Sequence, residues 1–76
     1  GGYKGVSTAL KFLRDLIGVV RSGGAIYMVL SSLGDLEYFE AGASEMGYRL
    51  EAVAKAKLFY EELVVYRIYR PPDKGL

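Results

Sequence analysis

A short, continuously apolar run in the middle of the chain restricts its fold more than any other feature. Residues Ala25 to Leu30 are apolar without alternation, and they stand between a pair of glycines and a pair of serines. An unbroken apolar run of this length, bounded by turn residues, is typical of a strand that is covered on both faces, as in a parallel α/β sheet. The sequence therefore predicts an inner strand over Ala25 to Leu30 in an α/β fold.

Two amphipathic helices flank this run. From Thr8 to Arg21 the apolar side chains fall on one half of a helical wheel and most charged side chains on the other, with Ser7 as a candidate N-cap. A second helix is predicted after Asp35, whose side chain can cap it, and Gly47 ends it. Its apolar residues recur at helical spacing and are Leu36, Phe39, Ala43 and Met46.

The last third of the chain changes to strand-like patterning. From Tyr48 to Lys57 small or apolar residues alternate with charged ones, apart from one valine, which predicts a strand with one buried face. Residues Leu63 to Arg70 are rich in Val, Ile and Tyr, and two prolines follow them. A turn over Phe59 to Glu62 joins the two segments into an antiparallel hairpin. If the final strand lies between the other two strands, the sheet is open and ends in one reversed strand.

The predicted elements follow the order helix, strand, helix, strand, strand, in a single α/β domain over residues 1–76 with a loose tail over 71–76. The first helix has no preceding strand from which it could cross over, so we expect the domain to be partial. Hydrophobic residues also make up 51% of the 76 residues, although a chain of this length buries only about 60% of its unfolded surface on folding. We therefore expect a missing N-terminal half of the domain, or self-association, to cover the remaining apolar surface.

The composition excludes several kinds of chemistry. The chain has no Cys and no His, so it lacks the usual zinc ligands, thiolate nucleophiles and imidazole general bases. Ten basic and nine acidic residues leave a net charge of +1, which argues against a nucleic-acid surface. Its apolar runs are too short to span a bilayer and its first residues do not resemble a signal peptide. We expect a cytoplasmic protein with no membrane segment.

Two segments of the chain, together with the order of its elements, resemble a known protein family. The segment Gly1-Gly2-Tyr3-Lys4-Gly5-Val6 is similar to the Gly-Gly-x-Asp-Gly-Leu stretch that follows the catalytic Asn-Pro-Pro-Tyr of HemK/PrmC-type protein glutamine methyltransferases. Residues 57–68 resemble the hairpin of archaeal members of this family. The chain thus resembles the C-terminal half of a class I S-adenosylmethionine-dependent methyltransferase, which implies the C-terminal part of a Rossmann-like sheet ending in the hairpin.

The resemblance implies a function for a parent protein. That protein would transfer a methyl group from S-adenosylmethionine to a glutamine of a translation release factor. The family's cofactor-binding motifs and its Asn-Pro-Pro-Tyr do not occur here, and Lys4 stands where the family has Asp. We therefore expect no catalytic, cofactor-binding or metal-binding residue and no activity from the chain alone. The substrate-side loop implied by the resemblance consists of Gly1, Gly2, Tyr3, Lys4 and Gly5.

The class I arrangement also implies what surrounds the predicted strands. The strand over Ala25 to Leu30 would lie beside a neighbour that carries Asn-Pro-Pro-Tyr, both helices would cover the same face of the sheet, and one edge and much of one face would be bare. The alternative is a stand-alone interaction module that dimerises through the exposed sheet edge or face.

Two groups of polar residues allow a second interpretation. Ser31 and Ser32 follow the apolar strand, where ligands of open α/β sheets bind, whereas helix capping accounts better for Asp35. Glu61 and Glu62 could serve as a general acid and base, but adjacent side chains in a strand or turn point apart. We expect them to be solvated or paired with the lysines at positions 55 and 57.

The segment Tyr66-Arg67-Ile68-Tyr69-Arg70 interleaves aromatic and basic residues. Sheet surfaces that stack single-stranded RNA show the same pattern. The predicted order of elements differs from that of an RNA-recognition fold and the net charge is close to zero. The sequence therefore argues against RNA binding by this segment.

Overall fold

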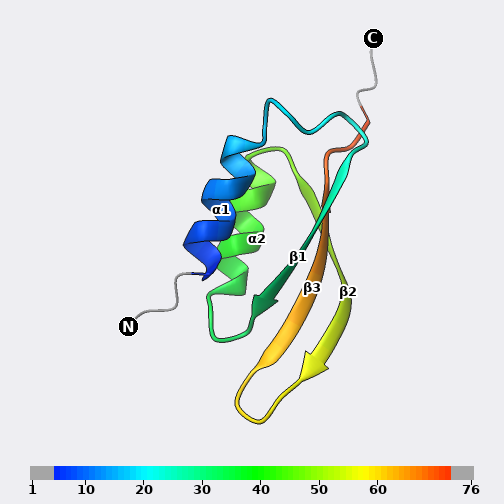
Figure 1. Cartoon of the computed structure of the whole chain (residues 1–76). Helices are drawn as coiled ribbons and strands as arrows, with labels where there is room; N and C mark the ends of the chain where they lie inside the picture. Colours follow the sequence, from blue (N-terminus) through cyan, green and yellow to red (C-terminus); the bar gives the residue numbers. More distant parts are fainter. Residues whose placement is uncertain (1–4, 73–76) are drawn as a thin grey trace.

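The computed structural model describes residues 5–72 and contains two helices and three strands in the predicted order (Figure 1). It is a small α/β fold with a single antiparallel sheet. Along the chain the elements are α1 (Gly5–Asp15), β1 (Ala25–Ser31), α2 (Leu36–Glu45), β2 (Arg49–Lys57) and β3 (Glu62–Tyr69).

The final strand lies in the middle of the sheet, whose order is β1-β3-β2. Both pairings are antiparallel, with Met28 and Ala52 lying opposite Tyr66 from its two sides. The strands β1 and β2 therefore run parallel to each other with β3 reversed between them. The predicted hairpin and the open sheet with one reversed strand are both confirmed.

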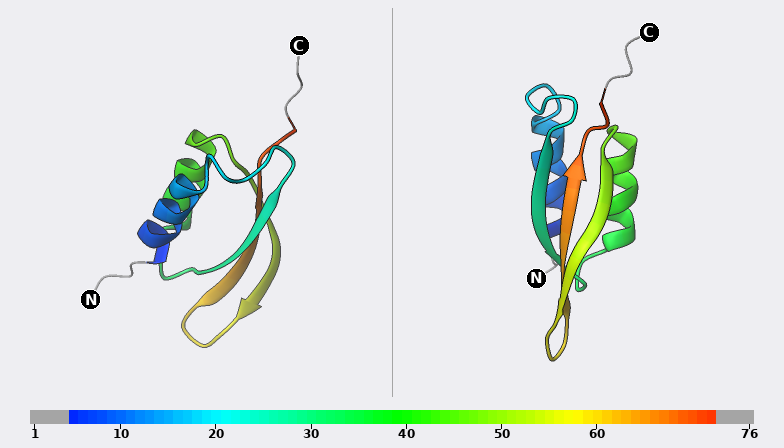
Figure 2. Two further views of the ribbon diagram at one scale, coloured as in Figure 1. Left: turned by 45° about the horizontal axis from the view of Figure 1, so that its top comes forward. Right: turned by 90° about the vertical axis from the view of Figure 1, so that its right-hand side faces the viewer.

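Both helices cover the same face of the sheet, with α1 behind β1 and α2 behind β2 (Figure 2). Gly42 of α2 lies against Leu10 of α1, where an added Cβ would come within 3.0 Å of the leucine side chain. The missing side chain thus lets the helices approach closely. The buried core lies between helices and sheet and consists of Val6, Ala9, Leu10, Leu13, Leu30, Phe39, Ala43, Tyr48, Val64, Tyr66 and Ile68.

The prediction that β1 is covered on both faces is wrong. Its side chains alternate, and Tyr27 and Val29 on the helix-free face are 63% and 59% exposed. Ile26 and Met28 pack against the core from the other face. An unbroken apolar run specifies that both faces avoid water, but among the described residues only one face has a covering layer.

A β-bulge in β2 corrects the predicted alternation of that strand. The pairing with β3 shifts between Ala52 and Ala54, which leaves Val53 without a partner. Beyond the bulge the faces are exchanged, so that Lys55 lies opposite the buried Val64 on the helix side. The alternation continues in the sequence, but an extra unpaired residue turns every later side chain to the other face.

The predicted ends of α2 are confirmed, whereas the predicted ends of α1 are wrong. Asp35 Oδ1 accepts a hydrogen bond of 2.9 Å from the Tyr38 amide, and Gly47 follows the helix with a φ of +95°. In contrast, α1 begins at Gly5, before the predicted N-cap Ser7, and ends at Asp15 rather than at position 21.

Two hydrogen bonds from residues next to the ends of β2 and β3 account for the early end of α1. The hydroxyl of Tyr48 donates to the carbonyl of Leu13 at 2.7 Å, and the guanidinium of Arg70 donates to that of Ile17 at 2.8 Å. These side chains satisfy carbonyl groups that would otherwise need a further helical turn. The tail predicted to begin at Pro71 is held at its first residue, whose carbonyl accepts a hydrogen bond from the Ser22 hydroxyl at 3.1 Å.

Candidate interaction surface

The edge of β1 that faces away from β3 is the first part of the candidate site. Within residues 5–72, β1 pairs with β3 alone, so its other edge presents unpaired backbone groups. The strand contains no charged residue, no proline and no bulge. Natural sheets protect an exposed edge with such features, because an unprotected edge pairs readily with another chain.

A shallow apolar groove runs beside this edge, between α1 and β1. Its volume is about 470 Å³. Phe12, which is 50% exposed, forms part of its wall. Its full lining consists of Gly5, Thr8, Ala9, Phe12, Met28, Val29 and Leu30. The strand edge and the groove together offer backbone hydrogen bonds next to an apolar slot, which is what an added strand and its side chains require.

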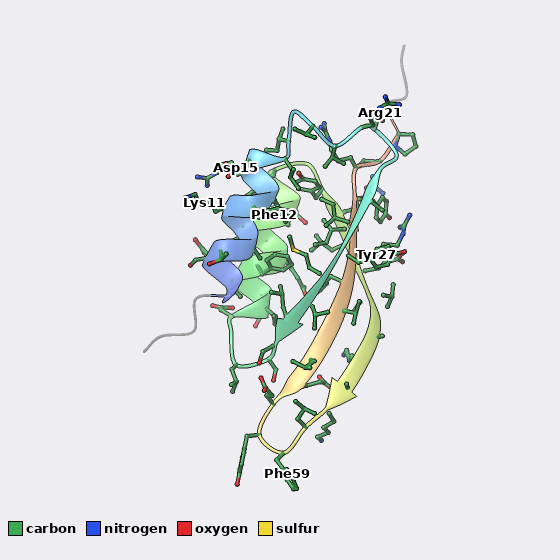
Figure 3. The ribbon with its side chains drawn as sticks, viewed as in Figure 1. Lys11, Phe12, Asp15, Arg21, Tyr27 and Phe59 are labelled. Carbon is green, nitrogen blue, oxygen red and sulfur yellow. The ribbon has the colours of Figure 1, made fainter. Side chains whose placement is uncertain are left out.

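The helix-free face of the sheet adjoins the same edge. Tyr27 lies on this face, away from the helices (Figure 3). Because of the bulge, Val29, Val65 and Ala54 form one apolar row across the three strands. The next row toward the opposite end of the sheet joins Tyr27, Arg67 and Glu51. The face is thus apolar toward the hairpin turn and charged toward the other end.

The Tyr66–Arg70 segment is divided between the two faces. Tyr66 and Ile68 are buried against the helices, whereas Arg67 and Tyr69 lie on the helix-free face. The Arg67 guanidinium stacks 4.4 Å from the centre of the Tyr69 ring and pairs with the Glu51 carboxylate at 3.1 Å. Arg67 and Tyr69 therefore share the helix-free face, where the Arg67 charge is already paired with Glu51, and Tyr66 is buried on the other side.

The two acidic residues of the hairpin make separate hydrogen bonds. The Ser31 hydroxyl donates to the Glu61 carboxylate, and Ser31 is 1% exposed. The Glu62 amide donates to the Ser32 hydroxyl at 2.8 Å. Glu61, which was expected to be solvated or paired with Lys55 or Lys57, thus accepts a hydrogen bond from Ser31 instead.

Within the described residues, the pKa values of two buried tyrosines, Tyr48 and Tyr66, are shifted. Burial raises the pKa of Tyr66, and a hydrogen bond of 2.6 Å from its hydroxyl to Glu40 raises it further. Burial also raises the pKa of Tyr48, against an opposing effect of Arg70. Burial of both rings, and at Tyr66 also the contact with Glu40, favours the protonated phenols, which indicates a structural role.

The substrate-side loop implied by the sequence falls mostly outside the described residues, which exclude Gly1, Gly2, Tyr3 and Lys4. Gly5 is the first residue of α1 and borders the groove beside β1. It is helical and not part of a loop, which corrects the prediction for that position. Across residues 5–72 no group of three or more acidic side chains is placed to hold a metal ion. No helix in this range is long and apolar enough to cross a membrane.

The aromatic pair in the hairpin turn was not recognised from the sequence as a candidate site. Phe59 and Tyr60 are 98% and 93% exposed, and Phe59 projects past the end of the sheet (Figure 3). Two adjacent aromatic residues inside a predicted turn were a usable signal, because turns normally consist of small and polar residues. The half-exposed Phe12 gave no such signal, since it fits the apolar half of the helical wheel.

Comparisons with protein-family models, with curated proteins and with solved structures found no match for this chain.

Proposed function

We propose that this chain is the C-terminal part of a class I S-adenosylmethionine-dependent methyltransferase that acts on a protein glutamine. The observation that carries the proposal is the unprotected β1 edge, on a sheet whose last strand is reversed between β1 and β2. The resemblance to HemK/PrmC-type enzymes implies a neighbouring strand with Asn-Pro-Pro-Tyr at that edge. In this proposal the remainder of the domain supplies that strand.

The groove beside β1 supports the same arrangement. Gly5 borders the groove at the start of α1. The resemblance places the segment containing Gly5 directly after the catalytic motif. The start of α1 therefore lies where a chain leaving the neighbouring strand would enter the helix. The role of β1 and α1 is to hold the neighbouring strand and to keep water from its inner side.

The described residues do not fit S-adenosylmethionine, which supplies the methyl group in this family. Ser31 at the carboxyl end of β1 is already hydrogen-bonded to Glu61. The groove beside β1 is lined by apolar side chains, Thr8 and a glycine, with no carboxylate for the ribose. The remainder of the domain would have to bind the cofactor, and the chain alone is proposed to be inactive.

The proposal is tested with the reading frame that contains this chain. We expect the frame to continue upstream of the Gly1 codon into an Asn-Pro-Pro-Tyr sequence. Its purified product should bind S-adenosylmethionine with micromolar affinity and methylate a glutamine of a release factor. The 76-residue chain should bind the cofactor no more tightly than millimolar in a calorimetric titration. A start codon directly before Gly1, or micromolar binding by the chain alone, contradicts the proposal.

The second candidate function is a stand-alone module that dimerises through β1. The specific observation in its favour is that the strand is self-complementary. In an antiparallel pairing of two copies about Met28, Tyr27 of one copy lies opposite Val29 of the other, and Ile26 lies opposite Leu30. Aromatic and β-branched pairs of this kind stabilise antiparallel strands by about 0.2–1 kcal/mol each. A full-length protein that lacks the upstream half would favour this candidate.

A further inference from the structure

The turn between β2 and β3 exposes more apolar surface than any role in this fold requires. Phe59 and Tyr60 are almost fully exposed, and the neighbouring Leu58 is 48% exposed. The two rings lie 6.3 Å apart at an angle of 41° and contact each other rather than the core. Removing these side chains would cost the folded chain little, so packing within the described residues does not explain them.

The turn is held firmly at its base. The Leu58 amide donates to the Glu61 carbonyl at 2.8 Å, which closes the turn. The Glu61 carboxylate accepts from the buried Ser31, whose hydroxyl oxygen in turn accepts from the Leu33 amide at 3.1 Å. These contacts connect the hairpin turn to the turn that follows β1. A turn with a fixed backbone loses less conformational entropy when it binds a partner, so the backbone that carries the aromatic side chains is preorganised.

The hairpin turn lies at the functional end of the proposed sheet. It follows the carboxyl end of β2, and the turn after Ser31 follows the carboxyl end of the parallel strand β1 (Figure 1). Ligands of open α/β sheets bind beyond the carboxyl ends of the parallel strands. The exposed aromatic pair therefore stands on the side of the sheet where the substrate would approach.

The charges around the turn favour a protein partner. Lys55 and Lys57 of β2 are balanced by Glu61 in the turn and by Glu62 at the start of β3. A nucleic acid or an anionic membrane surface would select an excess of basic residues at the contact. Exposed aromatic side chains on a rigid support that carries no net charge are typical of anchors that fill apolar pockets of other proteins.

We propose that Leu58, Phe59 and Tyr60 form an anchor that inserts into an apolar pocket on the surface of the protein substrate. The inference rests on the proposed methyltransferase function and adds a docking contact outside the catalytic motif. Ser31 and Glu61 act as positioning residues that hold the anchor beside the carboxyl ends of β1 and β2. The anchor contributes to binding of a folded substrate and has no part in the transfer of the methyl group.

The test compares the full-length enzyme with a Phe59→Ala/Tyr60→Ala variant and with a control, Val19→Ala/Tyr38→Ala. The control removes two similarly apolar side chains, which are 70% and 61% exposed, away from the hairpin. Two substrates are used: a whole release factor and a short peptide that contains its acceptor glutamine. Direct binding of the release factor to each protein is measured in a separate fluorescence titration.

We expect the hairpin variant to raise KM for the whole release factor by about 30-fold, the scale of a binding hot spot, with kcat and the KM for the peptide unchanged. The control should match the original enzyme on both substrates. An unchanged KM, or an equal rise for protein and peptide, overturns the anchor. If the original enzyme methylates neither substrate, the proposed function fails and the titration decides: release-factor binding that the hairpin variant loses supports the anchor, and equal or absent binding overturns it.

Discussion

The two outer strands of the sheet differ in how they are protected against pairing. Strand β2 carries four charged residues and a bulge at Val53, both of which hinder the addition of another strand. Strand β1 has neither, and its outer face exposes Tyr27 and Val29. The free edge of β2 is therefore protected against pairing, whereas the free edge of β1 is not. The difference supports the proposal that another strand pairs with the free edge of β1 and not with that of β2.

The two outer strands β1 and β2 both pair with the central strand β3, so the stability of β3 is tested first. Ile68 of β3 is fully buried in the core. Replacing Ile68 by Ala should destabilise the chain by about 2–5 kcal/mol, because it leaves a cavity in the core. Urea unfolding followed by circular dichroism measures this loss. A Val53→Ala change on the exposed edge should stay within about 0.5 kcal/mol, and equal losses for both variants would mean that the core is not where we place it.

The edges themselves are compared by adding one charge to each. Val29 on β1 and Val53 on β2 are 59% and 49% exposed, so neither substitution by Lys should unfold the chain. We expect the purified 76-residue chain to self-associate at micromolar concentration through β1. Val29→Lys should weaken this association by about tenfold or more, because a charged side chain on an edge strand opposes the addition of another strand.

Val53→Lys is the matched control and should leave the association unchanged. Sedimentation equilibrium of the three proteins distinguishes the cases. A monodisperse monomer from the original chain would mean that the β1 edge does not pair with itself. Equal weakening by both variants would place the contact elsewhere on the molecule.

The order of elements, the α2 caps, the hairpin and its central reversed strand were predictable from the sequence, because each depends on local patterning. The bare face of β1 and the bulge at Val53 were not. The apolar run of β1 predicted cover on both faces, but the fold leaves Tyr27 and Val29 exposed on the helix-free face. The bulge depends on the pairing of β2 with β3, which alternation alone does not reveal. The candidate edge followed from the resemblance, whereas Phe59 and Tyr60 were singled out by their exposure in the structure, although two aromatic residues in a predicted turn were already a signal in the sequence.

The contact between Ser31 and Glu61 links the open edge to the hairpin, and its loss should have a smaller effect. Replacing Ser31 by Ala removes a donor to the Glu61 carboxylate and an acceptor for the Leu33 amide. We expect a loss of about 1–3 kcal/mol in unfolding free energy, because the partner groups are left unsatisfied. Thermal unfolding measures it. Ser44→Ala on the exposed side of α2 serves as the control, and an equal shift in both variants would contradict a role for the contact.

Because Tyr66 of the central strand is buried, we expect the free energy of unfolding to depend on pH. Burial and Glu40 raise the pKa of Tyr66 in the folded state, so the unfolded chain loses its phenolic proton first. Stability from this group is fully present below the unfolded pKa of about 10 and is lost as the pH rises above it, by up to about 1.4 kcal/mol per pH unit. Urea unfolding between pH 9 and pH 11, values chosen around that pKa of about 10, measures the slope. A Tyr66→Phe variant should show a flatter slope, and an identical slope contradicts this assignment.

The ion pair on the helix-free face should make the smallest contribution to the stability of the fold. Glu51 on β2 pairs with Arg67 at 3.1 Å, and its side chain is 53% exposed. A Glu51→Lys change should cost less than about 1 kcal/mol, because exposed ion pairs are weak and screened by salt. Thermal unfolding at low and high salt checks this value. A larger loss that persists at high salt would mean that the charged half of this face is buried in an interface.

Hydrogen exchange of the backbone amides tests the central claim most directly, because it reports the two edges separately. About half of the amides in each outer strand point away from β3. In the full-length protein we expect the outward amides of β1 to be protected as strongly as those of β3, while those of β2 exchange rapidly. In the dilute 76-residue chain both sets should exchange rapidly. Outward β1 amides that exchange as fast as those of β2 in the full-length protein would contradict the claim that β1 is built to be covered.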